Sequence, residues 1–383
     1  MKHDKAITKA IIYELANWLT IDKPFSKEQL ARLQEEQYYL PLISLAHNFW
    51  LIGALVQQLK NKKVWKNLPE ELVSYLAEIE MIYFLRSEKM IKEAHYSCGI
   101  LKNKNIEIVM LKGIAALFND SYKVISERYM VDIDLLVKEE NALDSYSALQ
   151  NEGYFEQPGE FDIQVPNHHH FPALIRNDGC CYIEIHRNAL KNSINKVLRT
   201  QEIWQECITL PIGNNIVVNQ PSPTHQLILA IAHSELSDNN YGNRVFELKQ
   251  IHNAYIIAHF YYEEIDWDKV KHHFLRVQLL YVLENMMFSI YQIYDFFTPL
   301  TKKIDIRSQN HLAESIDRYI TCQGEQTLRE RVKMIFEGYN YLSILYLYGG
   351  SGYFPVFIGR LKHFVRHCKI LLKSLSKSIK RIK

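Results

Sequence analysis

Two aspartates separated by one residue, Asp132 and Asp134, have the spacing that points most directly to chemistry. They lie in the run 131–137, which alternates at its start and then becomes apolar, as a strand does on entering a core. Side chains two apart in a strand share a face, so the two carboxylates lie side by side and repel each other. Mg²⁺ held together with substrate phosphates relieves such repulsion. The alternative is a solvated strand end, where acids keep a sheet edge soluble.

A third carboxylate, Glu184, lies in a second predicted strand at 181–186. Together with the two aspartates it forms a three-carboxylate cluster of the kind that binds two metal ions for phosphoryl transfer. His186 follows two residues later and shares the face of Glu184. It is either a partner of a carboxylate, a phosphate contact or a structural histidine.

A lysine and a glycine precede these acids. Gly113 ends a predicted strand just before a short helix, where backbone N–H groups can receive phosphate oxygens. Lys112 beside it and Arg128 further on add positive charge for phosphate binding. The alternatives are a solvated lysine for Lys112 and a pairing with the aspartates for Arg128.

Histidines form a second group of candidates. In His168-His169-His170, neighbouring strand residues point to opposite faces, so we expect at most His168 and His170 to converge. Orienting a substrate or Glu184 is favoured over a dedicated metal site. His225 and His233, eight residues apart, share one face of a predicted helix and are expected to serve in packing.

Short strands must position these residues within a mainly helical chain. Apolar residues recur at helical spacing before residue 100 and from residue 222 onward. Between these regions, helices are expected at 114–119 and 139–152, the second closed by Gly153. We expect strands at 106–111, 131–137, 181–186 and 216–218.

The ordered set of residues resembles a known family. The set comprises Leu111-Lys112-Gly113, Arg128, Asp132-Ile133-Asp134 and Glu184-Ile185-His186. In this order it is similar to the uncharacterised nucleotidyltransferase family of the DNA polymerase β-like superfamily. The resemblance implies a glycine-containing strand-to-helix turn, a D-x-D strand and a third acid on a later strand.

The resemblance also implies fold, activity and cofactors. The fold is α+β: a small mixed nucleotidyltransferase sheet with helices, flanked by helical N-terminal and C-terminal regions. The activity is transfer of a nucleoside monophosphate from an NTP, with ATP expected, by two Mg²⁺ ions. Asp132, Asp134 and Glu184 would be the metal-binding and catalytic residues, while Gly113, Lys112, Arg128 and His186 would contact the donor. The acceptor stays open between a small molecule, a protein and a tRNA.

The expected domain organisation has four parts. These are a helical N-terminal segment, a nucleotidyltransferase domain, a helical domain and a basic amphipathic tail, at 1–100, 101–220, 221–355 and 356–383.

The charge of the chain is unevenly distributed. The net charge is +2, yet residues 360–383 hold nine Lys or Arg and no acid. Apolar residues recur there every three or four positions, which predicts a basic amphipathic helix. That helix either packs on the acidic body of the protein or lies on an anionic membrane surface. Nucleic acid is less favoured because no set of stacked aromatic residues is interleaved with the basic residues of this segment.

Composition excludes several classes of protein. With 48% hydrophobic and 23% charged residues, the chain is neither disordered nor low in complexity. Six cysteines without C-x-x-C spacing indicate reduced thiols rather than a zinc ribbon. We expect a cytoplasmic protein, with peripheral membrane association through the tail as an open alternative. A non-catalytic membrane-associated scaffold with a degenerate nucleotidyltransferase fold is the second hypothesis for function.

Overall fold

The computed structural model describes residues 5–156, 168–177, 179–213, 215–302 and 305–322. Within them the chain is an α+β protein, with a seven-stranded mixed sheet between helical regions, which confirms the expected fold class. The basic tail predicted at 356–383 lies outside the described residues. No helix among those that are described is long and apolar enough to span a membrane.

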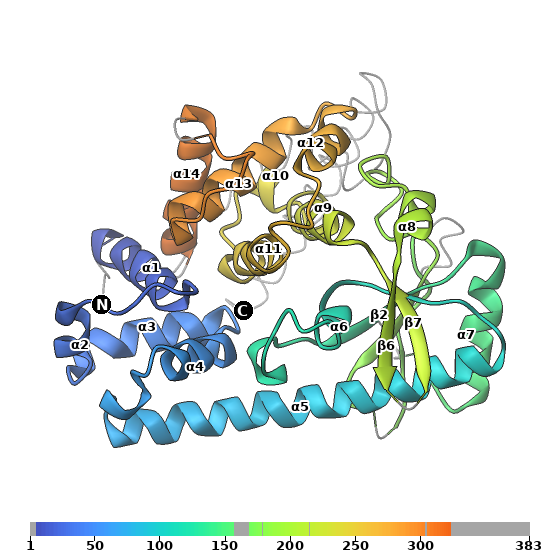
Figure 1. Ribbon diagram of the computed structural model, residues 1–383, viewed down its shortest axis with the longest axis horizontal. Helices are drawn as coiled ribbons and strands as arrows, with labels where there is room; N and C mark the ends of the chain where they lie inside the picture. Colours follow the sequence, from blue (N-terminus) through green and yellow to red (C-terminus); the bar gives the residue numbers. More distant parts are fainter. Residues whose placement is uncertain (1–4, 157–167, 178, 214, 303–304, 323–383) are drawn as a thin grey trace, which may run out of the picture.

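The N-terminal region consists of short helices followed by one long one. The helices are α1 (Lys5–Leu19), α2 (Lys27–Arg32), α3 (Glu36–Asn48), α4 (Ile52–Asn61), η1 (Trp65–Asn67) and α5 (Glu70–Asn103). Helix α5 has 34 residues and therefore extends for about 51 Å. In Figure 1 it runs along one side of the molecule, from the other N-terminal helices to the sheet.

The sheet has the strand order β3-β4-β5-β2-β1-β7-β6. Its strands are β1 (Val109–Met110), β2 (Asp132–Leu136), β3 (Phe155–Glu156), β4 (Leu174–Ile175), β5 (Tyr182–His186), β6 (Ile208–Gly213) and β7 (Ile216–Gln220). The pairs β2–β5 and β1–β7 are parallel, and the other pairs are antiparallel. The two strands that carry the acids are therefore neighbours in the middle of the sheet.

Helices within and after the sheet complete the fold. Those between the strands are α6 (Lys112–Ala116), η2 (Ile125–Glu127), η3 (Glu139–Asn141), α7 (Ala142–Asn151) and α8 (Thr200–Glu206). The C-terminal helices are α9 (Pro223–Ala232), the π-helix η4 (His233–Ser237), α10 (Asn240–Asn243), α11 (Leu248–Phe260), α12 (Trp267–Leu275), α13 (Leu280–Tyr294) and α14 (Ile306–Cys322). Helix α9 begins where Pro223 follows Ser222, whose hydroxyl accepts a hydrogen bond from the His225 backbone N–H.

The sheet lies between two hydrophobic cores. Ile133 and Leu135 of β2 face a core that includes Met90 and Cys98 of α5. Leu136 points to the opposite face and belongs to a second core. That second core joins the N-terminal helices to the C-terminal helices, for example through Leu15, Leu19, Ile290 and Tyr294. The even-numbered residues of β2, including both aspartates, therefore face the C-terminal helices.

Most expected elements are present, with shorter or shifted bounds. The strand predicted at 106–111 covers only Val109–Met110. The helical pattern at 40–59 is divided between α3 and α4, because Trp50 adopts a left-handed backbone with φ +56°. Strands β3, β4 and β6 were not predicted, since two of them have only two residues and β6 contains Pro211. The four domain boundaries stay predictions.

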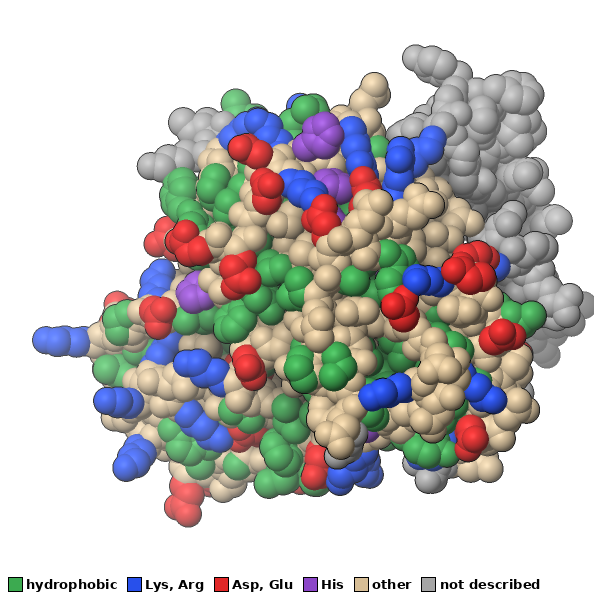
Figure 2. Space-filling model, turned by 45° about the vertical axis from the view of Figure 1, so that its right-hand side comes forward, with side chains coloured by type: hydrophobic (Ala, Val, Ile, Leu, Met, Phe, Trp, Pro, Cys, Tyr) green, Lys and Arg blue, Asp and Glu red, His purple; other side chains and the backbone are tan. Residues whose placement is uncertain are grey.

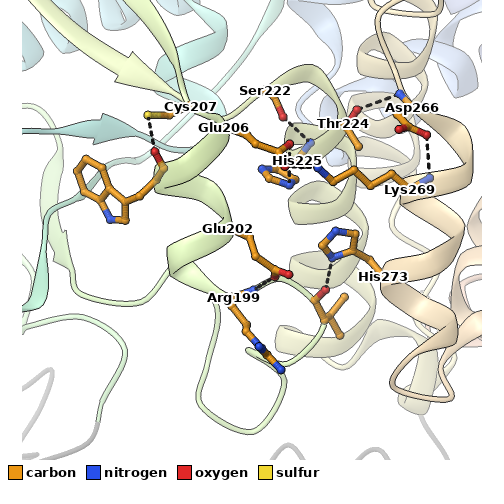
Figure 3. A network of polar contacts seen from close by, with 12 residues as sticks. Arg199, Glu202, Glu206, Cys207, Ser222, Thr224, His225, Asp266, Lys269 and His273 are labelled. Carbon is orange, nitrogen blue, oxygen red and sulfur yellow. Dashed lines mark hydrogen bonds and ion pairs between the residues drawn. The ribbon is translucent and has the colours of Figure 1, made fainter.

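A polar network connects the α/β part to the C-terminal helices (Figure 3). Lys269 of α12 forms an ion pair with Glu206 at the end of α8. His225 of α9 is fully buried, with its Nε2 3.6 Å from Glu206 Oε2, and neither ring nitrogen has a hydrogen-bond partner among the described residues. His273 Nδ1 donates to the Val197 carbonyl at 2.7 Å. His225 is thus a packing residue, as expected.

We expect this histidine to make the fold sensitive to acid. Burial lowers the pKa of His225 from 6.5 to about 4, against the attraction of Glu206. As pH falls below 6.5, the unfolded chain takes up a proton that the folded chain does not, so stability is lost. Between about pH 7.5 and about pH 5 this loss amounts to about 1–2 kcal/mol.

Urea unfolding at the two pH values measures this loss. Between these pH values, the free energy of unfolding of His225→Leu should fall by about 1–2 kcal/mol less than that of wild type. The matched control is His47→Leu, since His47 is exposed and its replacement should leave the pH dependence unchanged. An equal loss of stability in His225→Leu and wild type would contradict this assignment.

Candidate active site

The register between β2 and β5 brings the three predicted acids together. Asp134 lies directly opposite Glu184, and Asp132 lies opposite Tyr182. Asp132 is two residues from Asp134 and shares its face, so all three carboxylates lie on the side of the sheet covered by the C-terminal helices.

Two cationic groups compensate the central carboxylate. Lys112 Nζ lies 2.6 Å from Asp134 Oδ1, and His186 Nε2 lies 2.8 Å from the same oxygen. His186 Nε2 is also 3.1 Å from Glu184 Oε2. Asp134 is 2% exposed and His186 is fully buried. A buried charge without a partner is costly, so Lys112 and His186 are required for Asp134 to stay ionised.

The pKa directions of the three acids differ because their partners differ. Burial, reinforced by the Asp134 carboxylate, raises the pKa of Asp132 from 3.8 to about 6. For Asp134, burial is outweighed by Lys112 and His186, which hold the pKa well below its usual value. For Glu184, burial is outweighed chiefly by the hydrogen bond from His186, and the pKa is lowered. Asp132 is therefore the least compensated of the three.

His186 is placed to carry a proton on both ring nitrogens. Its Nδ1 lies 3.3 Å from the Asn188 carbonyl oxygen, while Nε2 faces two carboxylates, and all of these partners only accept hydrogen bonds. Burial opposes the charge, but the bonds to Asp134 and Glu184 prevail and raise the pKa of His186. His186 thus acts as a partner of the carboxylates, one of the roles left open by the sequence.

A cavity of about 550 Å³ lies between the acidic face of the sheet and helices α9 and α11. This volume is within the range of sites that hold small molecules and cofactors. Asp132 and Glu184 line it, whereas Asp134 and His186 lie behind its wall. Four cationic side chains also line the cavity: Lys112, Arg128, Lys191 and Lys249. The cavity therefore presents carboxylates on the sheet and positive charge around them.

Arg128 contacts the helical region rather than the aspartates. Its Nη1 donates to Asn253 Oδ1 of α11 and, at 3.3 Å, to the Tyr122 hydroxyl. Its buried Nε has no partner within the described part of the chain. No ion pair between Arg128 and Asp132 or Asp134 is found among the described residues, so the proposed pairing with the acids is wrong.

Two glycines hold the segment that carries Arg128. A side chain on Gly113 would collide with Met130 and with Arg128 Nε. On the other side, Gly53 of α4 lies so close to the Ser126 backbone that a Cβ atom has no room. Arg86 of α5 donates from Nε to the Met130 carbonyl at 2.7 Å. The N-terminal helices thus fix one wall of the cavity.

The three consecutive histidines all converge, contrary to expectation. One nitrogen of each ring, in His168, His169 and His170, lies within 4.8 Å of the others. The chain bends at His169, and His170 forms a single antiparallel bridge with His186, so strand alternation does not apply. All three line the same cavity as Glu184.

Sequence reasoning missed the cavity residues contributed by the helical region. Lys249 and Asn253 lie on α11 and Lys191 lies between β5 and α8, far from the acids in sequence. Burial, followed by the nearby Arg128 guanidinium, lowers the pKa of Lys249 from 10.5 to about 8. A helical pattern does not distinguish a lysine facing a cavity from one facing solvent, so no signal in the sequence singled them out.

The donor set fits a divalent cation. Carboxylate oxygens of Asp134 and Glu184 lie within 4.8 Å of each other, and Asp132 adds a carboxylate on the same face. Carboxylate oxygens are the ligands that Mg²⁺ prefers. Burial and the Asp134 carboxylate raise the pKa of Asp132, and a cation at the cavity wall would favour its ionised form.

A mixed sheet with a D-x-D strand, a third acid on the adjacent parallel strand and a cavity beside them defines a protein of the nucleotidyltransferase class. The sequence model of the uncharacterised nucleotidyltransferase family matches residues 40–294. The chain belongs to this family, as its motifs indicated. Membership supports nucleotidyl transfer as the general activity and an NTP as a substrate. No curated protein and no solved structure was found to match the chain.

The close packing at Gly113 gives a prediction for stability. In Gly113→Ala the new Cβ would lie 2.9 Å from Met130 Cγ and from Arg128 Nε. We expect destabilisation of about 1–3 kcal/mol, because the neighbours must shift in a packed wall.

Gly99→Ala is the matched control. Gly99 lies within α5, and a Cβ there would be 3.7 Å from Ile216 Cδ1, an ordinary contact. Alanine should stabilise this helix by about 0.5–1 kcal/mol. Urea unfolding measures the free energy of unfolding of both variants. Equal values for Gly113→Ala and Gly99→Ala would contradict the close packing around Gly113.

Proposed function

We propose that this protein transfers a nucleoside monophosphate from an NTP, with ATP expected, to a hydroxyl or phosphate acceptor. The observation that carries the proposal is the pairing of Asp134 with Glu184 across β2 and β5, with Asp132 on the same face, beside a cavity of about 550 Å³. Negative charge gathered at the base of a cavity lined by cations fits a site where metal ions and phosphates meet.

Asp132, Asp134 and Glu184 would hold two Mg²⁺ ions through carboxylate oxygens. When bound, the ions activate the attacking hydroxyl and stabilise charge on the transferring phosphoryl group. Lys112 and His186 hold the buried Asp134 carboxylate ionised and oriented in the free protein.

The side chains of the protein then have separate roles in transfer. Glu184, which lines the cavity, would accept the proton of the acceptor hydroxyl. The acceptor oxygen forms a bond to the α-phosphorus while the bond between that phosphorus and the oxygen bridging to the β-phosphate breaks. Lys112, Arg128 and Lys249 would attract the departing pyrophosphate, and Gly113 lines the same cavity.

The acceptor is a small molecule, a protein or a tRNA. A nucleic-acid footprint requires positive charge gathered on one face. On the face shown in Figure 2, Lys and Arg are interspersed with Asp and Glu, which supports a small molecule or a protein. Contact with an anionic membrane would involve residues 360–383, outside the described part, and remains a separate proposal.

The decisive experiment measures NTP binding by thermal shift with and without Mg²⁺. A ligand at about 100 times its Kd stabilises the native protein by about 2.7 kcal/mol. We expect a Mg²⁺-dependent shift with one NTP in wild type and none in Asp132→Asn. Because Asp132 is the least compensated acid, this variant should be at least as stable as wild type without ligand.

Asp144→Asn on the exposed surface of α7 is the control and should keep the full shift. Asp134→Asn is less informative, since loss of its bonds to Lys112 and His186 destabilises the fold. No shift with any NTP in folded wild type would favour the non-catalytic scaffold instead.

Lys249 gives the proposed NTP site a pH dependence. The ammonium attracts a triphosphate only when protonated, and its pKa in the free protein is lowered to about 8. NTP affinity in wild type should therefore fall several-fold, up to about tenfold, as pH rises from about 7 to about 9. Isothermal titration calorimetry at both values measures this change.

Two variants separate this effect from other titrations. Lys249→Arg stays charged and should lose less affinity at high pH, while Lys249→Met should bind weakly at both values. Lys92→Met removes an exposed lysine of α5 and serves as the control. A Lys249→Met variant with wild-type affinity at about pH 7 would remove Lys249 from the site.

A further inference from the structure

Helix α5 presents a stripe of exposed side chains along about half of its length. The opposite face of the helix is buried against the fold through Leu72, Leu76, Tyr83, Met90 and Ala94. The exposed stripe consists of Tyr75, Glu78, Ile82, Leu85, Lys89 and Lys92. Its members recur alternately at three and four positions, which is the heptad spacing by which one helix pairs with another.

The centre of the stripe is apolar although it faces water. Ile82 is 51% exposed and Leu85 is 47% exposed, while Met81 beside them is 56% exposed. Single apolar side chains are common on protein surfaces, but a contiguous group on one helix is typical of a contact with another protein. None of the three lines the cavity, and α5 runs along one side of the molecule (Figure 1). The nucleotidyl transfer proposed above therefore uses none of them.

Opposite charges flank this apolar centre. Glu78 lies one turn before Ile82, and Lys89 lies one turn after Leu85. Neither Glu78 nor Lys89 forms an ion pair with another described residue, unlike the neighbouring Glu80, which pairs with a lysine of α4. The stripe thus has a negative end and a positive end around an apolar middle.

We propose that a second copy of this chain packs its α5 antiparallel on this stripe, forming a two-fold symmetric dimer. The register that fits is centred between residues 83 and 84. It places Ile82 of one copy opposite Leu85 of the other, and Glu78 of one copy opposite Lys89 of the other. Because a two-fold axis repeats every contact, the dimer contains each of these pairs twice.

Charge selects this arrangement over the alternatives. In a parallel pair each stripe residue would meet its own copy, so that Glu78 would face Glu78 and Lys89 would face Lys89. An antiparallel register shifted by one heptad would place Ile82 opposite Glu78, or Leu85 opposite Lys89. Either shift covers a charge with an apolar side chain, which costs free energy. The antiparallel register centred between residues 83 and 84 avoids both penalties.

The size of the stripe sets the expected affinity. From residue 75 to residue 92 the helix extends for about 26 Å. One helix face of this length covers less than the about 800 Å² per partner of a standard interface. We therefore expect a weak dimer with a dissociation constant of about 10–100 µM. Its formation does not depend on the proposed nucleotidyl transfer, because the stripe lies outside the cavity.

Sedimentation equilibrium of the full-length protein tests the dimer. Between about 5 and about 300 µM, wild type should change from mostly monomer to mostly dimer. Leu85→Asp should raise the dissociation constant at least tenfold, because the new charge would be covered by Ile82 of the other copy. Leu143→Ser, at an exposed position of α7, is the control and should dimerise as wild type does. Circular dichroism reports whether each variant is folded.

Reversal of the charges tests the register. Glu78→Lys and Lys89→Glu should each stay monomeric, because in each variant both pairs become repulsive. Mixed in equal amounts, the two variants should form a heterodimer, since every lysine at these positions then faces a glutamate of the other chain. Failure of the mixture to dimerise, with both variants folded, would contradict the register.

The outcome for wild type decides the inference as a whole. A wild type that stays monomeric at about 300 µM would overturn the dimer and leave the stripe to another part of this chain or to a different protein. A dimer unaffected by Leu85→Asp and by both charge reversals would also overturn it. The Mg²⁺-dependent thermal shift with NTP should be the same in Leu85→Asp as in wild type, which separates this test from that of the proposed function.

Discussion

Concentrated negative charge in a buried place is the constraint on which this structure depends. Asp132, Asp134 and Glu184 share one face of two central strands, and Asp134 is almost inaccessible to water. Such charge is tolerated only with partners, which Lys112 and His186 supply. Asp132 lies at the cavity wall, where burial and the Asp134 carboxylate raise its pKa, so added positive charge there would stabilise its ionised form.

The surrounding fold buries these charges but leaves a cavity beside them. The sheet is buried on both faces, with α5 and α7 on one side and the C-terminal helices on the other. The cavity lies between the acidic face of the sheet and helices α9 and α11. The remaining wall of the cavity is the loop that carries Arg128. Close contacts at Gly53 and Gly113 fix this loop, so the position of Arg128 depends partly on N-terminal helices that are far from the acids in sequence. The family match includes part of these helices, since it begins at residue 40.

The cavity combines groups of different chemistry within a small volume. Carboxylates on the sheet suit hard cations, the cationic side chains suit phosphates, and the three imidazoles of 168–170 add nitrogen atoms to the same cavity. These groups come from the sheet, from α11 and from the segment before β4. Glu184 lies opposite Asp134 in the sheet, and its Oε2 is 3.8 Å from His170 Nε2.

The sequence alone determined the strands that carry the acids and the shared face of Asp132 and Asp134, because alternation along a strand is a local property of the backbone. It also determined the helical regions and the family, through periodicity and motif order. The tertiary structure decided that Arg128 bonds to Asn253 rather than to the acids, that Lys249 enters the cavity, and that three consecutive histidines converge. Each of these depends on the approach of distant segments or on a bend in the backbone, which local patterns do not encode.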